Sequence, residues 1–244
     1  MVRIGIIGAA GRMGRAIAAS LEDCDEAGLA GGADQGDDCG ALARVSDVLV
    51  DFSSPDALAS NLEAAAAASV PIVIGTTGLG GDQHRLIDDA SAGIAVLQSA
   101  NMSLGVNLLA FLVREASRRL GPDWDVEIVE MHHRMKVDSP SGTALLLGSA
   151  AAEGRGVDLE AVSDRGRDGI SGARTPGHIG FASLRGGSVA GDHQVILAAE
   201  GERIELGHRA ESRAIFAKGA IKATLWLHGK PPGRYSMSDV LGLT

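Results

Sequence analysis

The first 21 residues constrain the fold of this 244-residue chain more than any other segment. Residues 1–7 have the pattern of a short apolar strand, and residues 15–21 have that of an amphipathic helix. Between them lies Gly8-Ala9-Ala10-Gly11-Arg12-Met13-Gly14, whose glycines permit a tight turn and close approach of the backbone to a pyrophosphate. Asp34 follows a second strand-like segment, where a carboxylate would meet a ribose hydroxyl. Together these features predict a dinucleotide-binding α/β domain.

Strand and helix patterns continue to alternate through residue 120. Strands are expected over residues 47–52, 70–75 and 94–98, and helices over residues 57–68, 83–90 and 104–120. Ligands of an open parallel sheet gather beyond the carboxyl ends of its strands. Two turns at such ends, Gly75-Thr76-Thr77-Gly78 and Ser99-Ala100-Asn101-Met102, are therefore candidate cofactor contacts.

The polarity pattern changes after residue 120. Alternating segments at residues 124–132, 180–185, 194–199 and 203–208 predict a mixed or antiparallel sheet with one covered face. Residues 163–178 are rich in Gly and Arg without periodicity, which predicts a mobile loop that is either functional or disordered. A helical pattern returns over residues 213–227.

The block from His132 to Thr143 carries the clearest chemical signal. His132, His133 and Lys136 follow an alternating strand, and Ser139-Pro140-Ser141-Gly142-Thr143 then opens an apolar helix. A helix N-terminus offers backbone N–H groups to an anion, and Gly142 has no Cβ to keep a ligand away. Either His132 or Lys136 could transfer a proton to a small bound carboxylate. An ordinary helix start preceded by exposed histidines would have the same pattern.

Composition narrows the classes of partner. A formal net charge of −9 with no basic stripe argues against nucleic acid. Cys24 and Cys39 have no metal-ligand spacing and form no disulfide framework, so no metal site is expected. There is no signal-peptide pattern and no apolar run long enough to span a bilayer, so the chain is expected in the cytoplasm, without a membrane partner.

Other functions for the same motifs fail on their own residue requirements. A short-chain dehydrogenase needs Tyr-x-x-x-Lys, but Asp239 stands four residues after the single tyrosine, Tyr235. A phosphoryl-transfer loop needs Gly-Lys-Ser/Thr, whereas Gly229-Lys230 is followed by Pro231. His132 and His133 are neighbours, and neighbouring residues on a strand point to opposite faces, so the two histidines cannot chelate one zinc ion without a turn. A non-catalytic sensor of NAD(P)H would explain the dinucleotide motif but not the lysine and carboxylate pocket.

The motifs together resemble the dihydrodipicolinate reductase family, also called 4-hydroxy-tetrahydrodipicolinate reductase, nearly end to end. The resemblance rests on the Gly8–Gly14 loop, Gly75-Thr76-Thr77-Gly78, Ser99-Ala100-Asn101-Met102-Ser103, residues 180–193 and above all His132-His133-Arg-x-Lys136-x-Asp138-x-Pro140-Ser141-Gly142-Thr143. It implies an NAD(P)H-dependent oxidoreductase of the diaminopimelate route to lysine that delivers hydride to a cyclic imine dicarboxylate.

The resemblance also implies an architecture. The fold would be α/β, with a Rossmann-like doubly wound parallel sheet and an inserted α+β substrate-binding and oligomerisation domain. Residues 1–103 and 213–244 would form the dinucleotide-binding domain, and residues 104–212 the substrate domain. Family members usually form homotetramers through the sheets of the substrate domain.

Carried over residue by residue, the resemblance makes His132 the proton donor or acceptor and Lys136 a proton donor. His133, Gly142 and Thr143 would contact the substrate. The contacts to NADH or NADPH would be Gly8, Ala9, Ala10, Gly11, Arg12, Met13, Asp34, Gly75, Thr76, Thr77, Ser99, Ala100, Asn101 and Met102.

The chain departs from the family pattern at two positions. Met135 stands where many relatives carry a further histidine, so any auxiliary role of that side chain is absent. Gln35 follows Asp34 where some relatives place an arginine that can meet a 2′-phosphate. A carboxylate without an adjacent cation favours NADH, but Arg12 could compensate, so the use of both cofactors stays open.

Overall fold

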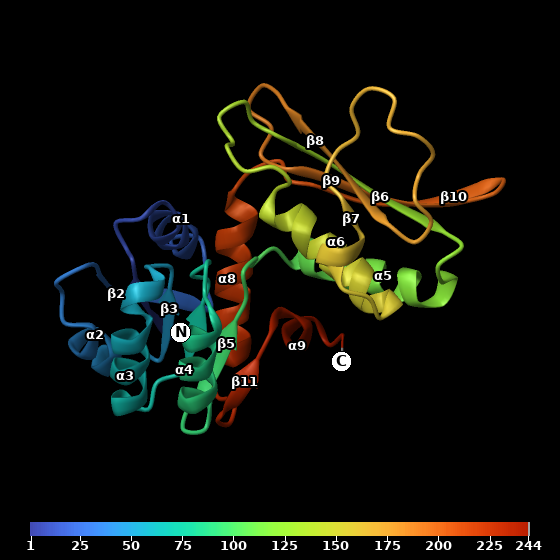
Figure 1. The fold of residues 1–244 in the computed structure, drawn as a ribbon. Helices are drawn as coiled ribbons and strands as arrows, with labels where there is room; N and C mark the ends of the chain where they lie inside the picture. Colours follow the sequence, from blue (N-terminus) through green and yellow to red (C-terminus); the bar gives the residue numbers. More distant parts are fainter. Residues whose placement is uncertain (244) are drawn as a thin grey trace. The chain divides into compact units, whose positions relative to one another are not determined.

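A computed structural model describes residues 1–243 of the chain. They divide into two compact units, one of Met1–Leu104 with the residues from Ala214 onward and one of Gly105–Arg213 (Figure 1). The boundaries expected from the resemblance differ from these by one residue each, and the binding roles assigned to the two units stay predictions.

The first unit contains a six-stranded sheet in which every neighbouring pair is parallel. Its order is β11-β5-β4-β3-β1-β2. β2 therefore lies on one side of β1, and β3, β4, β5 and β11 follow one another on the other side. This confirms the predicted doubly wound α/β sheet. The strands are β1 (Val2–Ile7), β2 (Ala27–Ala33), β3 (Val48–Asp51), β4 (Ile72–Ile74), β5 (Ala95–Gln98) and β11 (Gly233–Tyr235).

Helices cover both faces of this sheet, because its strands are apolar on both sides. On one face, Ile4 and Ile6 of β1 pack with Ile17 and Ala220 from the helices α1 and α8. On the other face, a second core packs against α2, α3 and α4. The helices of this unit are α1 (Arg12–Leu21), α2 (Cys39–Val45), η1 (Pro55–Ala57), α3 (Leu58–Ala68), α4 (Gly81–Ser91), α8 (Ala214–Leu227) and α9 (Met237–Leu241).

The second unit contains a five-stranded mixed sheet in the order β10-β9-β6-β8-β7. Its central strand β6 pairs parallel with β8 and antiparallel with β9. The helices α5 and α6 cover one face, where Val126 and Ile128 are buried with Leu147 of α6. Its elements are α5 (Leu104–Leu120), β6 (Asp125–His132), α6 (Gly142–Arg155), α7 (Leu159–Val162), β7 (Ser163–Asp164), β8 (Ile179–Arg185), β9 (Asp192–Ala199) and β10 (Glu202–Arg209).

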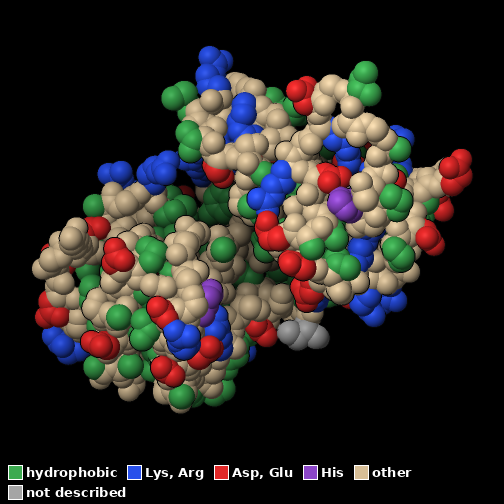
Figure 2. Space-filling view, viewed as in Figure 1, with side chains coloured by type: hydrophobic (Ala, Val, Ile, Leu, Met, Phe, Trp, Pro, Cys, Tyr) green, Lys and Arg blue, Asp and Glu red, His purple; other side chains and the backbone are tan. Residues whose placement is uncertain are grey.

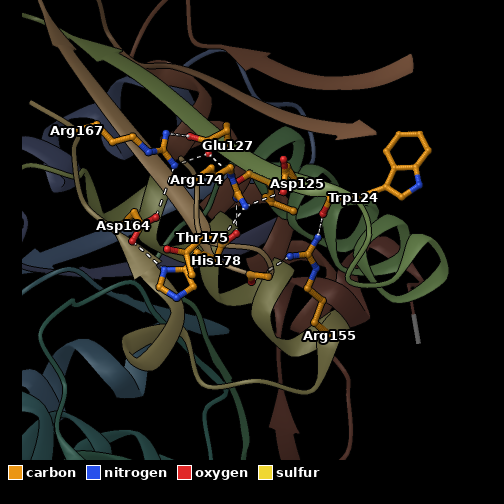
Figure 3. Close-up of polar contacts among 11 residues, drawn as sticks. Trp124, Asp125, Glu127, Arg155, Asp164, Arg167, Arg174, Thr175 and His178 are labelled. Atoms are coloured by element: carbon orange, nitrogen blue, oxygen red, sulfur yellow. Dashed lines mark hydrogen bonds and ion pairs between the residues drawn. The ribbon is translucent and has the colours of Figure 1, made fainter. Parts of the chain in front are cut away.

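The segment expected to be a mobile loop begins as a strand and is then held by ion pairs. Ser163 and Asp164 pair with β8. Further along, Arg174 contacts Asp125 and Glu127 of β6 at 2.8 Å each, and Arg167 contacts Glu127 at 2.9 Å (Figure 3). Periodicity did not reveal these contacts, because they join charges about 40 to 49 positions apart in the chain. The loop is therefore anchored to the sheet by its arginines.

The surface carries charges of both signs. Figure 2 shows Asp and Glu side chains interspersed with Lys and Arg on the visible face, with acidic side chains at the end of the β9–β10 hairpin. Glu200 and Glu202, at this hairpin, are both exposed. Among residues 1–243, no helix has the length and apolar character needed to cross a bilayer.

Candidate functional site

The glycine loop after β1 is shaped by backbone contacts that exclude side chains. Gly8 has φ +81°, and a Cβ there would lie 2.7 Å from the carbonyl oxygen of Phe52. A Cβ at Gly14, within α1, would lie 2.3 Å from the carbonyl oxygen of Gly8. Because real Cβ atoms do not approach backbone this closely, only glycine lets α1 begin directly on the loop. The loop thus has the close helix–strand packing that the sequence predicted.

Asp34 lies beside this loop at the end of β2. Its carboxylate accepts hydrogen bonds at 3.0 and 3.1 Å from the backbone N–H of Ala10. A cavity of about 650 Å³ lies at the carboxyl ends of β1, β2 and β3, with Gly8, Gly11 and Asp34 in its lining. It is formed where the strand order reverses about β1, which is where open α/β sheets bind their ligands.

A second cavity, of about 420 Å³, lies at the carboxyl ends of β3, β4 and β5. It brings together most of the other residues predicted to contact the cofactor: Arg12, Met13, Gly75, Thr76, Thr77, Ala100, Asn101 and Met102. The predicted residues Ala9, Ala10 and Ser99 do not line either cavity. Ser99 instead donates a hydrogen bond from its hydroxyl to the carbonyl of Asn101 at 2.8 Å and shapes the turn after β5.

Phe52 and Ser53 line both cavities and were missed from the sequence. Ser53 is held by Asp51, which is fully buried and accepts hydrogen bonds from the backbone and the hydroxyl of Ser53 at 2.8 and 2.6 Å. The sequence could have indicated them, because both residues directly follow a buried strand. Gly75 and Ser99 were predicted as cofactor contacts because they stand at the same position after their own strands.

In the second unit, His132 is the last residue of β6 and lies on its covered face. Period-two alternation places Val126, Ile128, Glu130 and His132 on this face, and all four are buried. The Nδ1 atom of His132 lies 2.5 Å from Oε2 of Glu130. The ring also meets that of His193, on β9, edge to face at 5.1 Å. The imidazole is therefore held on two sides.

The segment after His132 contains Lys136 and leads to the start of α6. Lys136 Nζ forms an ion pair of 2.8 Å with Asp138, and this hydrogen bond lowers the pKa of the Asp138 carboxyl. Ser141 caps α6 by accepting a hydrogen bond from the backbone N–H of Ala144 at 3.1 Å. The helix begins at Gly142, where a Cβ would meet open space. This combination of an ammonium group and a helix N-terminus can bind a carboxylate.

His133 follows the last residue of β6 and is half-buried. Its Nε2 lies 3.0 Å from the guanidinium of Arg213. Burial, followed by the electrostatic effects of Arg213, His132, Lys136 and Arg185, lowers the pKa of His133. Cationic and N–H groups therefore surround the substrate contacts predicted in this unit, although the contacts themselves stay predictions.

Sequence reasoning assigned no role to Glu130, Arg185 or His193. Arg185 forms two hydrogen bonds with the Glu130 carboxylate, at 2.8 and 2.9 Å. His193 is 4% exposed, and its Nε2 lies 3.1 Å from the hydroxyl of Ser141. Among residues 1–243, no group of three or more His, Cys, Asp or Glu side chains could hold a metal ion.

Comparisons with known proteins cover both units. The N-terminal domain model of dihydrodipicolinate reductase matches residues 2–102, and the C-terminal domain model matches residues 105–241. The 4-hydroxy-tetrahydrodipicolinate reductase of Zymomonas mobilis is 60% identical over 99% of this chain and 98% of its own length. That of Parvibaculum lavamentivorans is 52% identical over the same shares.

A solved structure shows the same fold. The dipicolinate-bound dihydrodipicolinate reductase from Paenisporosarcina sp. TG-14 matches 97% of each chain with a TM-score of 0.80 at 23% identity. The family models cover nearly the whole sequence, and the curated relatives exceed half identity at full length. The chain belongs to the dihydrodipicolinate reductase family.

Proposed function

We propose that the chain reduces 4-hydroxy-tetrahydrodipicolinate to tetrahydrodipicolinate with NADH or NADPH, in the diaminopimelate route to lysine. The observation that carries this proposal is the arrangement of buried His132, Lys136 and the open start of α6 in the second unit. The names of full-length relatives at 52% and 60% identity support it.

The chemistry divides between cofactor and protein. A bound reduced nicotinamide would supply a hydride to the ring of the substrate, and the hydroxyl group of the substrate would leave as water. The chain would supply the proton from His132 or Lys136, because both side-chain types can act as general acids. The two substrate carboxylates need cations and N–H donors, for which His133, Gly142 and Thr143 are the predicted contacts.

The structure supports a preference for NADH. Asp34, Gln35 and Asp37 line the cavity at the end of β2, where a 2′-phosphate would lie, and carboxylates repel a phosphate. Arg12 lines the other cavity, with Gly75 and Asn101. It is therefore not placed among the residues that would receive the 2′-phosphate, which weakens its case as a compensating cation.

We further propose a cytoplasmic homotetramer assembled through the sheet of the second unit. The face of this sheet opposite α5 and α6 carries apolar side chains, among them Leu184, which is 51% exposed, and the half-buried Val129 and Met131. Apolar surface of this kind is typical of protein–protein contacts. Sedimentation should give a mass about four times the 24.9 kDa of one chain.

The test of the activity is the loss of reduced-nicotinamide absorbance with substrate made in situ from pyruvate and aspartate semialdehyde. NADH and NADPH are compared in parallel. Turnover that disappears in Lys136→Ala supports the reductase.

A non-catalytic NAD(P)H sensor is the alternative. Tight NADH binding without turnover would favour it. A reductase should also bind pyridine-2,6-dicarboxylate in a Lys136-dependent manner, whereas a sensor should not.

A further inference from the structure

One buried carboxylate connects three parts of the second unit. Glu130 is 1% exposed, and both of its oxygens are occupied. Its Oε1 accepts hydrogen bonds from Arg185 at 2.9 Å and from the backbone N–H of Ser141 at 3.2 Å. Its Oε2 accepts one from Arg185 at 2.8 Å and lies 2.5 Å from Nδ1 of His132. Glu130 therefore links the proton-transfer histidine, the start of α6 and the end of β8.

We propose that Glu130 is a positioning residue that fixes His132 in the tautomer with its proton on Nδ1 and so leaves Nε2 to exchange the proton with substrate. Arg185 holds the carboxylate for this task. The inference rests on the proposed function, because it concerns the proton transfer assigned there to His132.

The contacts of Glu130 require its ionised form. Arg185 and the backbone N–H of Ser141 can only donate hydrogen bonds, and a carboxylate can only accept them. Burial by itself would raise the pKa of Glu130, but the hydrogen bonds from Arg185, His132 and Ser183 outweigh it and lower that pKa. An ionised Glu130 has no proton to give, so the proton between Oε2 and Nδ1 belongs to the imidazole.

The opposite edge of the imidazole is the one that can exchange a proton. Nε2 of His132 faces Gly191, where a Cβ would lie 3.0 Å from that nitrogen. Because residue 191 is a glycine, it places no side chain against this edge. The edge-to-face contact with His193, at an angle of 74°, limits rotation of the ring. Proton transfer at Nε2 then leaves the hydrogen bond to Glu130 intact.

Arg185 extends the same network to the second proton-transfer residue. Its guanidinium donates a hydrogen bond of 2.6 Å to the backbone carbonyl of Asp138. The side chain of Asp138 pairs with Lys136 at 2.8 Å. The pairing of β6 with β8 sets this geometry, because it places Arg185 directly beside His132. One arginine therefore fixes both the carboxylate behind His132 and the loop that carries Lys136.

The first experiment needs no variant at Glu130. Nitrogen-15 NMR of the histidine-labelled full chain, with the His132 signals assigned through His132→Gln, reports which ring nitrogen of the neutral imidazole carries the proton. We expect the proton on Nδ1. A neutral ring with its proton on Nε2 would overturn the inference, whatever the activity of the enzyme.

The second experiment compares Glu130→Gln with Glu127→Gln. Glu127 is a matched control because it lies on the same strand, but on the other face of the sheet. Like Glu130, it forms ion pairs with arginine, in its case Arg167 and Arg174 (Figure 3). We expect Glu130→Gln to lower kcat roughly 10²- to 10⁴-fold, since its amide can donate to Nδ1 and stabilise the wrong tautomer. Glu127→Gln should keep kcat within about 3-fold of the wild type.

Binding and folding controls separate positioning from general damage. Glu130→Gln should retain its affinity for pyridine-2,6-dicarboxylate within about 10-fold, because anions bind through Lys136 and the start of α6. An unchanged kcat in Glu130→Gln, or an equal loss in Glu127→Gln, would overturn the inference. If Glu130→Gln does not fold, the inference is tested by the NMR measurement of the His132 tautomer in the wild type. Absence of turnover in the wild type would instead refute the proposed function.

Discussion

Acidification should destabilise the second unit through His193. This ring is 4% exposed, and burial, with the electrostatic effect of His132 next in size, lowers its pKa to about 4. An unfolded chain would protonate the same ring at a pKa of about 6.5. The folded state therefore binds fewer protons in this range, and stability falls as the pH drops from about 6.5 towards 4.

The size of the effect follows from the two pKa values. At about pH 5 the unfolded ring is almost fully protonated and the folded ring is almost neutral, so the loss relative to about pH 8 is about 2 kcal/mol. Other titratable groups around the ring are Glu130, His208 and Lys136. Burial lowers the pKa of His208 as well, so the wild type should lose somewhat more than His193 alone contributes.

The assay is urea unfolding at both pH values, for the wild type and His193→Gln. The chain has two tryptophans, Trp124 in the second unit and Trp226 in the first. A Trp226→Phe background makes fluorescence report on the second unit alone. In the parent protein, the free energy of unfolding should fall between about pH 8 and about pH 5. In His193→Gln this fall should be smaller by about 2 kcal/mol. An equal fall in both proteins would refute a buried neutral His193.

Three further predictions test the candidate site. Gly14→Ala should weaken NADH binding, measured by calorimetry, at least about 10-fold, because the added Cβ would collide with the Gly8 carbonyl. The control Gly81→Ala should bind NADH normally, because a Cβ at residue 81 meets open space. Gln35→Arg should raise kcat/KM with NADPH relative to NADH about 10-fold, because it places a cation beside Asp34; an unchanged ratio would contradict the assignment of that cavity. His132→Ala and Lys136→Ala should each lose roughly 10²-fold or more in kcat while the Kd for NADH persists, and an unchanged kcat would remove that residue's role.

The fold of the first unit could be predicted from local pattern. Its strands are short apolar runs bounded by glycine or polar turns, with helical patterns between them. The helix predicted over residues 57–68, for example, is α3, over Leu58–Ala68. The strand β11 was missed because its three residues follow two prolines and show no alternation. The helix α2 was missed because it follows a run of Asp and Gly residues, although Asp38 caps it.

The candidate site was only partly predictable, for a different reason. Motifs identified residues next to one another in the chain, such as His132 and Lys136, since a motif records local spacing. Arg185 stands 55 positions from Glu130, and only the register of β6 against β8 brings them together. No local pattern contains that register. Long-range ion pairs also fix the loop before β8, which its composition alone made look mobile.

One part of the missing information was nevertheless present in the sequence. The alternation over residues 124–132 puts Glu130 on the same face as Val126 and Ile128, and that face must be covered for the strand to be stable. A carboxylate on a covered face is costly unless several donors satisfy it. Such an acid, two residues before a histidine at the end of the strand, therefore predicts a buried network even where its cationic partner is unknown. The register of the sheet then identifies Arg185 as the partner, which is why this network could be anticipated from the sequence but completed only with the structure.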